Sequence, residues 1–227
     1  MGEAGTRTPR ERYRAQVQEE VKQHAWAQIA TAGASALSLN AIAKQMGMSG
    51  PALYRYFANR DELITELVKD AYRSLADTFA ARAEAGTDLD GLAHALRGWA
   101  LDDPQRYFLV YGTPVPGYQA PEDTTRTAGE IMAHLLDACA AEEPPAGHPS
   151  AEEPPAASRP LDGHLDDYRA WAGEHPAPPS ALRRALAFWT RLHGVLSLEL
   201  AGHFTGMGFD PAELYADEVR ALAGRWA

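Results

Sequence analysis

Apolar residues recur at helical spacing along almost the whole chain of 227 residues. In the first such segment, Tyr13 to Ala32, an apolar residue occupies every fourth position, and Gly33 follows as a helix stop. No segment of more than a few residues shows the apolar and polar alternation of a half-buried strand. The pattern predicts an all-α protein. The recurring residues of the first helix are Val17, Val21, Ala25 and Ile29.

Two short helices joined by a three-residue turn are predicted directly after this first helix. Ser38 is suited to cap a helix of about two turns, whose apolar residues end at Gly47. The turn is 47–49, and Pro51 suits the first turn of a very short helix that follows. A helix, a tight turn and a short second helix are the plan of helix-turn-helix proteins, in which the second helix lies in the DNA major groove.

Charge is distributed unevenly along the sequence. Residues 1–60 contain 8 Lys/Arg and 4 Asp/Glu, whereas residues 61–227 contain 13 and 27. The formal net charge of −10 would by itself argue against a nucleic-acid partner. A small basic head on an acidic body instead indicates a nucleic-acid-binding segment within an otherwise acidic protein. We therefore predict a DNA-binding domain with a basic N-terminal arm in residues 1–60 and a second helical domain in residues 61–227.

The second domain is expected to begin with a long helix, since Asn59 and Glu62 form a capping-box pattern. Residues 113–118 cannot be helical, and residues 142–180 hold nine of the sixteen prolines, which predicts a loosely packed Pro-rich linker. The helix from Leu182 to Leu200 is apolar on two faces and must be buried on both, as a four-helix contact between two copies would achieve. Further helices are predicted to begin near Asp88, Asp103, Pro121 and Asp210, the last running to Trp226.

The segment from Ser38 to Leu63, SLNAIAKQMGMSGPALYRYFANRDEL, closely resembles the DNA-binding signature of the tetracycline-repressor (TetR) family of transcriptional regulators. The resemblance covers about residues 10–72. The body is similar to a subgroup with a Trp/His/Gly-bearing C-terminal domain, through WTRLHG at 189–194 and YFLVYGTPVPGY at 107–118. The resemblance implies an all-helical homodimer with N-terminal heads on double-stranded operator DNA. It also implies a body that encloses a small-molecule pocket and forms the dimer interface.

The outward side chains of the two short helices are the candidate DNA contacts. Tyrosine and serine hydroxyls and Arg60 could reach phosphates, while Arg55 could meet a guanine edge or another phosphate. The same residues match the family's contact positions, although the position of Arg60 usually holds lysine. A purely structural role remains open for each. The candidate DNA-binding residues are Ser38, Asn40, Gly50, Pro51, Ala52, Tyr54, Arg55, Tyr56 and Arg60.

Three functions are open for the body. A sensor is favoured, in which a small-molecule effector of unknown identity releases a repressor from a pseudo-palindromic operator. A DNA-binding regulator without a ligand is the second, and a helical enzyme domain fused to the head is the third. Glu199 and His203 share a helical face, but His193 points elsewhere and two ligands do not make a metal site. The candidate ligand-binding residues are Trp99, Tyr107, Phe108, Tyr111, Met132, Phe188, Trp189 and His193.

The sequence offers no catalytic motif, and we predict neither an enzyme nor a cofactor nor a metal. Cys139 is the only cysteine, so no internal disulfide can form. No signal-peptide or membrane-spanning apolar run is present. These observations predict a cytoplasmic protein that does not engage membranes.

Overall fold

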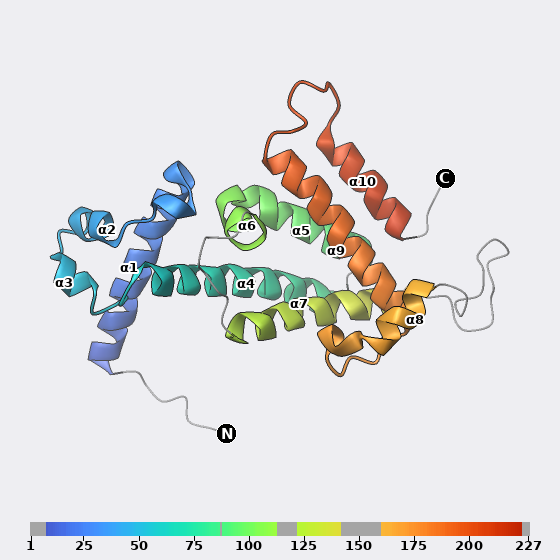
Figure 1. Cartoon of the computed structure of the whole chain (residues 1–227), viewed down its shortest axis with the longest axis horizontal. Coiled ribbons are helices and arrows are strands. Elements are labelled where there is room, and N and C mark those ends of the chain that lie inside the picture. Colours follow the sequence, from blue (N-terminus) through green and yellow to red (C-terminus); the bar gives the residue numbers. More distant parts are fainter. Residues whose placement is uncertain (1–7, 87, 113–121, 142–159, 224–227) are drawn as a thin grey trace. The chain divides into compact units, whose positions relative to one another are not determined.

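The computed structural model describes residues 8–86, 88–112, 122–141 and 160–223, and all regular structure within them is helical (Figure 1). The predicted all-α fold is confirmed. The elements in chain order are α1 (Pro9–Ala32), η1 (Ala34–Ala36), α2 (Leu39–Gln45), α3 (Gly50–Leu53), α4 (Arg60–Glu84), α5 (Leu89–Asp102), α6 (Pro104–Tyr111), α7 (Glu122–Ala141), α8 (Pro160–Asp167), η3 (Arg169–Ala172), α9 (Pro179–Leu200) and α10 (Pro211–Leu222).

The described chain divides into two compact units. The first comprises residues 8–71 and 108–112, and the second comprises the described residues of 72–107 together with 122–141 and 160–223. The sequence suggested a boundary at residue 60, where α4 begins. The first unit extends to Ala71, so α4 starts in one unit and ends in the other, and the boundary at residue 60 stays a prediction.

The first unit is built around α1, whose buried residues are the four that the spacing predicted. The helix begins at Pro9, four residues earlier than expected, because Thr8 and Glu11 form a capping box. Gly33 ends it with a φ of 76°, a backbone conformation that L side chains rarely adopt. The side chains that join α2 and α3 to this helix are buried: Leu37, Leu39, Ile42, Ala43, Leu53 and Phe57.

The turn between α2 and α3 is a Schellman motif. Gly47 has a φ of 66°, its amide donates to the Lys44 carbonyl at 3.2 Å, and the Met48 amide donates to the Ala43 carbonyl at 2.8 Å. α3 is very short, as predicted, since its helical residues end at Leu53. The predicted cap at Asn59 is present, because its Oδ1 accepts from the Glu62 amide at 2.8 Å.

In the second unit, α9 packs against α10, α7, α8 and α5. Its inner face is fully buried, while Trp189 is half-buried and Leu198 is 45% exposed. The sequence predicted that α9 is buried on two faces, and a single chain buries one of them. The buried residues of α9 are Ala181, Leu182, Ala185, Phe188, Leu192, Val195 and Leu196.

The linker predicted over 142–180 differs from the structure in its second half, where α8 and η3 form. Arg183 Nε donates to Asp162 Oδ1 at 2.8 Å, and the Asp162 side chain is only 5% exposed. Arg169 donates to the carbonyls of His175 and Ala177 at 2.6 and 2.9 Å. Proline content misled because Pro160 and Pro179 open helices, a position that proline favours. Residues 113–118, 142–159 and Trp226 lie outside the described part.

Candidate functional site: the DNA-binding face and the body cluster

The predicted DNA-contact residues surround α3 and the first turn of α2. Pro51, Tyr54 and Arg55 are exposed, as is Asn40 on α2. Gly50, Ala52 and Tyr56 are half-buried. The point at which a Gly50 Cβ would lie is 3.5 Å from Asn40 Oδ1, so the two short helices approach closely there. This face combines small residues that permit close approach to a groove with side chains that can reach its edges.

Ser38 has a structural task in the free protein. Its Oγ accepts from the Ala41 amide at 3.3 Å and thereby caps α2. Its own amide donates to Gln28 Oε1 at 3.0 Å. Gln28 was not predicted as a functional residue, because the hydrogen bond joins positions ten apart and leaves no local pattern. It fixes the start of α2 against α1.

Arg60 is partly occupied within the first unit. Its Nη2 donates to the Ala34 carbonyl at 2.7 Å, and Nη1 lies 3.9 Å from Asp61. The guanidinium therefore ties the start of α4 to η1. Any phosphate contact would have to use the remaining N–H donors. A substitution of Arg60 is a poor test of DNA contact, because it would also remove the hydrogen bond to Ala34.

Two cations of the head, Lys44 and Arg55, are exposed and have no acidic partner among the described residues. Arg14 differs, since its guanidinium lies over the Tyr56 ring at 5.3 Å from the centroid. An unpaired exposed cation beside a helix-turn-helix motif is free to meet a phosphate or a base. Lys44 was not among the predicted contacts.

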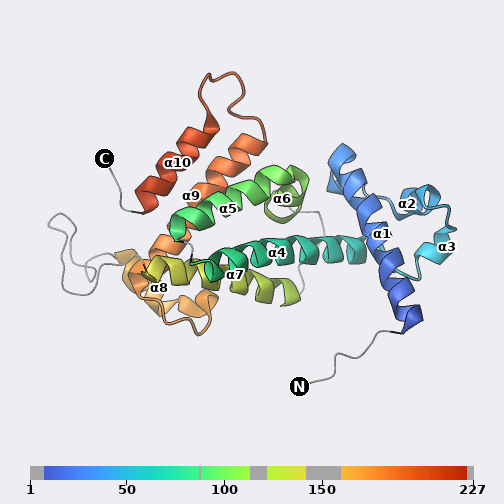
Figure 2. The ribbon, with the colours of Figure 1, turned by 180° about the vertical axis from the view of Figure 1, so that it is seen from behind.

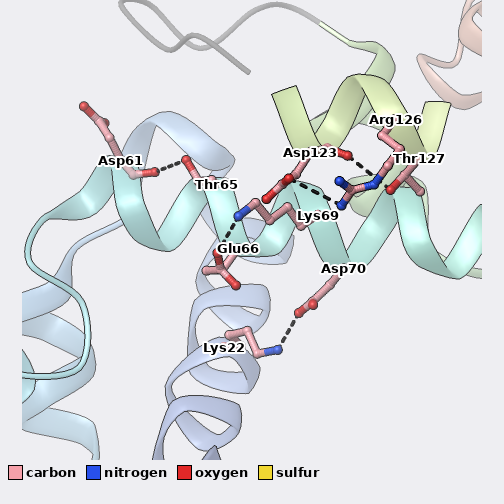
Figure 3. Close-up of polar contacts among 9 residues, drawn as sticks. All are labelled: Lys22, Asp61, Thr65, Glu66, Lys69, Asp70, Asp123, Arg126 and Thr127. Atoms are coloured by element: carbon pink, nitrogen blue, oxygen red, sulfur yellow. Dashed lines mark hydrogen bonds and ion pairs between the residues drawn. The ribbon is translucent and has the colours of Figure 1, made fainter. Parts of the chain in front are cut away.

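An ion pair between α1 and α4 holds the head together. Lys22 Nζ lies 2.6 Å from Asp70 Oδ2 (Figure 3). It also lies 2.9 Å from Glu19 Oε2, and the Lys22 side chain is only 17% exposed. Burial would lower the pKa of Lys22, but the hydrogen bonds to Asp70 and Glu19 outweigh that effect and raise it. The contact joins α1 to α4 at Asp70, two residues before the second unit begins at Tyr72.

Tyr107, His193 and Ser197 form a buried polar cluster in the second unit. The Tyr107 hydroxyl lies 3.0 Å from His193 Nδ1 and 2.9 Å from Ser197 Oγ, and donates to the His193 carbonyl at 3.2 Å. The Tyr107 and His193 rings stack with their centroids 5.6 Å apart, and the Trp189 ring centroid lies 4.4 Å from that of His193. We call Tyr107, Trp189, His193 and Ser197 the body cluster.

Burial determines the protonation of this cluster. It lowers the pKa of His193 to about 4, so the imidazole is neutral at pH 7. Burial also raises the pKa of the Tyr107 hydroxyl, against the hydrogen bond to Ser197. The cluster therefore presents neutral hydrogen-bonding groups and aromatic faces. Ser197 was missed, although its position four residues after His193 places both on one helical face.

The other predicted ligand residues have contacts or positions of their own. Trp99 Nε1 donates to Ser74 Oγ at 3.1 Å, and the Arg106 guanidinium lies 4.7 Å from the Trp99 ring centroid. Phe188 is fully buried in the core. Met132 lines a separate hollow of about 290 Å³ between α7 and η3. Phe108 and Tyr111 are half-buried and fall in the first unit.

Glu199, which was considered as a metal ligand, is engaged in an ion pair. Its Oε1 lies 2.5 Å from Arg97 Nη2, and the side chains are 14% and 20% exposed. The Arg97 guanidinium also lies 5.7 Å from the Tyr215 ring centroid. Within the described residues no group of three or more His, Cys, Asp or Glu side chains is placed to hold a metal ion.

Comparison with known proteins agrees with this arrangement. The family described as "Bacterial regulatory proteins, tetR family" matches residues 23–67, and "Tetracyclin repressor-like, C-terminal domain" matches residues 89–222. HTH-type transcriptional regulators Rv1816 of Mycobacterium tuberculosis and Mb1846 of Mycobacterium bovis are each 35% identical over 220 residues, 92% of both chains. The crystal structure of regulatory protein SCO4313 is 66% identical, with a TM-score of 0.84, over 96% of this chain and 100% of that one.

The helix-turn-helix head and the helical body define a DNA-binding transcriptional regulator. The chain belongs to the TetR family of such regulators, as the resemblance predicted. This family consists of transcriptional regulators and not of enzymes, so the alternative of an enzyme domain fused to the head is excluded. Among the described helices, none is both long and apolar enough to cross a membrane.

Proposed function

We propose that this protein is a homodimeric, cytoplasmic repressor that binds a pseudo-palindromic operator and leaves it when a small molecule binds in the body. The observation that carries the DNA part is the face of exposed Pro51, Tyr54 and Arg55, presented by a buried helix-turn-helix core. A two-fold dimer presents this face twice. Its operator should contain two matching half-sites about one helical turn, or a multiple of it, apart.

Arg55→Gln is expected to weaken operator binding by about 10-fold to 100-fold, because Arg55 is exposed, unpaired and placed on the recognition face. Tyr54→Phe, which removes only a hydroxyl, should have a smaller effect in the same direction. The operator is first selected from a random pool of short duplexes with the purified protein. Affinity is then measured by fluorescence anisotropy over a range of salt concentrations, where it should fall steeply with salt.

Arg82→Gln is the matched control. Arg82 is an exposed arginine near the end of α4, and its replacement changes the net charge by the same amount as Arg55→Gln. It should bind the selected duplex as the unmodified protein does. If Arg55→Gln and Tyr54→Phe both bound the selected duplex with wild-type affinity, α3 would not be the helix that recognises the DNA. If Arg55→Gln and Arg82→Gln lost the same amount of duplex affinity, the effect of Arg55→Gln would come from the change in net charge alone.

The body cluster supports the effector part of the proposal. Trp189 offers an aromatic face, and Tyr107, His193 and Ser197 offer hydrogen bonds in a buried setting. A largely apolar site with a few fixed polar groups is the usual build of a ligand pocket. Because His193 is neutral at pH 7, the cluster favours an uncharged aromatic or aliphatic ligand with a hydrogen-bonding group over an anion.

Helix α4 supplies the means by which the body could influence the head. Asp70 is bonded to Lys22 in the first unit, and Ser74 accepts from Trp99 in the second. Arg73 adds a contact to α7, since its Nη1 donates to Glu130 Oε2 at 2.6 Å. These α4 residues lie within about one turn. A displacement of α5 or α7 that moved Ser74 or Arg73 would be carried along a continuous helix to Asp70.

An effector found by thermal-shift screening of aromatic, lipid-like and antibiotic compounds should bind less tightly to the protein when operator is present. Coupling of this kind is typically 1–3 kcal/mol, and thermodynamic linkage makes it reciprocal. Trp189→Ala should weaken effector binding at least 10-fold while leaving operator affinity within about 3-fold. The measurement is a calorimetric titration of the compound with and without the selected duplex.

Trp171→Ala is the control, because Trp171 is a partly exposed tryptophan that lines the α7 and η3 hollow outside the body cluster. A compound whose binding responds to Trp171→Ala but not to Trp189→Ala binds elsewhere than proposed. Equal effector affinity with and without operator would favour the second function, a DNA-binding regulator that no small molecule controls.

A further inference from the structure

We propose that the first turns of α1 make a second contact with DNA, in which Arg10, Arg14 and Tyr56 bind one backbone phosphate beside the groove that α3 enters. This inference rests on the DNA-binding face proposed above and extends it beyond α2 and α3. The three residues are called the phosphate clasp below. All of them belong to the first unit.

Helix α1 is longer than the core that it supports. In two opposite views its first turns project past α3, on the side away from α2 (Figures 1 and 2). The buried residues of α1 begin at Val17, and none of residues 9–16 is buried. A partner that lies against α3 would therefore also lie within reach of these first turns.

The inward face of α1 changes from apolar to basic in these turns. Its buried residues recur every four positions from Val17 to Ile29. Arg14 and Arg10 continue the same stripe toward the N-terminus, at spacings of three and four. Arg12 lies about 200° round the helix from Arg10 and so faces away. The stripe that packs against the helix-turn-helix core thus ends in two arginines.

These arginines have no acidic partner that would explain them. Arg10, Arg12 and Arg14 are exposed, and none of them forms an ion pair with a described residue. The charges of the stripe are therefore not used to hold the first unit together. They remain available for an anion outside the chain.

Arg14 contacts Tyr56 through the face of the tyrosine ring. The guanidinium carbon lies 5.3 Å from the ring centroid, and such a cation–π contact leaves the N–H donors of arginine in place. Tyr56 follows the end of α3, where its amide donates to the Leu53 carbonyl at 2.8 Å. Within the described part of the chain, neither the Arg14 guanidinium nor the Tyr56 hydroxyl makes a hydrogen bond. The pair thus brings unused donors from α1 and from the end of α3 to one place.

A backbone phosphate is the partner that fits this set of donors. Arginine matches phosphate oxygens with its planar fork of N–H groups, and a tyrosine hydroxyl can donate a further hydrogen bond. Contacts to phosphates position a protein on the duplex but carry no sequence information. The phosphate clasp would therefore help to set how α3 meets the groove, and it would raise the affinity for different sequences alike.

Binding of the purified full chain to its selected duplex, measured by fluorescence anisotropy, tests the phosphate clasp. Arg14→Gln should weaken binding about 10-fold and Arg10→Gln at least about 3-fold, because each loses a charged hydrogen bond to phosphate. The slope of log affinity against log salt should decrease by about 1 for each phosphate contact that is lost. Circular dichroism confirms the helical content of every variant.

Arg12→Gln is the matched control. It removes the same charge from the same part of α1 but on the opposite face, so its affinity should stay within about 2-fold of that of the unmodified protein. All of these variants should keep the unmodified protein's preference for the selected duplex over duplexes with one base pair changed, since a phosphate contact does not read sequence.

A second series of duplexes identifies the phosphate. Each phosphate in turn is replaced by an uncharged methylphosphonate. At one position the replacement should weaken binding of the unmodified protein and of Arg12→Gln about 10-fold, and should not weaken binding of Arg14→Gln further. Tyr56→Phe keeps the ring beside Arg14 and should lose part of the same effect. A merely structural role of Arg14 would lower affinity without cancelling the effect of one particular phosphate.

The outcomes separate this inference from the DNA-binding face itself. A protein that selects no duplex would overturn both. If Arg14→Gln and Arg12→Gln bound the selected duplex equally well, α3 would remain the DNA-binding element and the phosphate clasp would be overturned. The clasp would also be overturned if every methylphosphonate that weakens binding of the unmodified protein weakened binding of Arg14→Gln to the same extent.

Discussion

Replacing Arg97 by methionine is expected to lower the free energy of unfolding by about 3 kcal/mol, because the change strands the Glu199 carboxylate in a mostly buried site. Arg97 Nη2 lies 2.5 Å from Glu199 Oε1, and the two side chains are 20% and 14% exposed. Removing one partner of such a pair typically costs 3–5 kcal/mol, and the partial exposure places this pair at the lower end. Urea unfolding at a fixed protein concentration measures the effect.

The double variant Arg97→Met with Glu199→Met should recover most of this loss, since replacing both partners of a buried pair is often neutral. Arg220→Met is the surface control. Arg220 pairs with Asp217 at 3.1 Å, but the side chains are 52% and 64% exposed, so its loss should cost less than about 1 kcal/mol. If Arg97→Met were no more costly than Arg220→Met, the pair would contribute nothing beyond an exposed one.

The head could be predicted from the sequence because its structure depends on local signals, whereas the body depends on long-range contacts such as the Arg97 pair. The head is defined by local signals: a cap at Ser38, a glycine at 47 that must adopt positive φ, and apolar residues at helical spacing. Each signal acts within about four residues and fixes the chain direction there. The helix-turn-helix motif, its buried core and the exposed face of α3 follow from these signals.

The contacts that shape the body join residues far apart in the sequence. Glu199 lies 102 residues from Arg97, and Ser197 lies 90 residues from Tyr107. Spacing placed Glu199 on a face with His203 and raised the possibility of a metal ligand, whereas packing against α5 gives it an arginine. Eight aromatic and polar residues were proposed as one pocket lining, and the structure brings the rings of Tyr107, Trp189 and His193 together.

Even in the head, one assignment depended on information that the local sequence lacks. Arg60 is predicted to contact a phosphate, from the family resemblance and from its charge. Its guanidinium also donates to the Ala34 carbonyl, 26 residues earlier in the chain. The motif fixes where the residue stands on α4, but only the packing of η1 beside it shows how much of the guanidinium is already used.

Stability is expected to fall by up to about 3 kcal/mol between pH 6.5 and pH 4 because of His193 alone. The pKa of His193 is about 4 in the folded protein and about 6.5 in the unfolded chain, because burial penalises the charged imidazole. As pH falls through 6.5, the unfolded chain gains a proton that the folded protein does not take up until about pH 4. The unfolded state is thereby favoured throughout this window, and the effect levels off below it.

The variant His193→Asn should remove this component, because asparagine does not titrate there. It is expected to be less stable at pH 7, where it loses the ring contacts with Tyr107 and Trp189, yet to lose less further stability on acidification. His94→Asn is the control, since it also removes one histidine but at a side chain that is 62% exposed. Urea unfolding at pH 7.0, 5.5 and 4.5 gives the change in the free energy of unfolding with pH for the unmodified protein and for each of the two variants.

The comparison isolates His193 because every other histidine and carboxyl group is common to the unmodified protein and the variant. Equal pH dependence in the two would mean that His193 is protonated in the folded state as readily as in the unfolded chain. The body cluster would then hold a cation at mildly acidic pH, and the expected preference for an uncharged effector would be lost. A difference of about 3 kcal/mol supports a neutral imidazole at physiological pH.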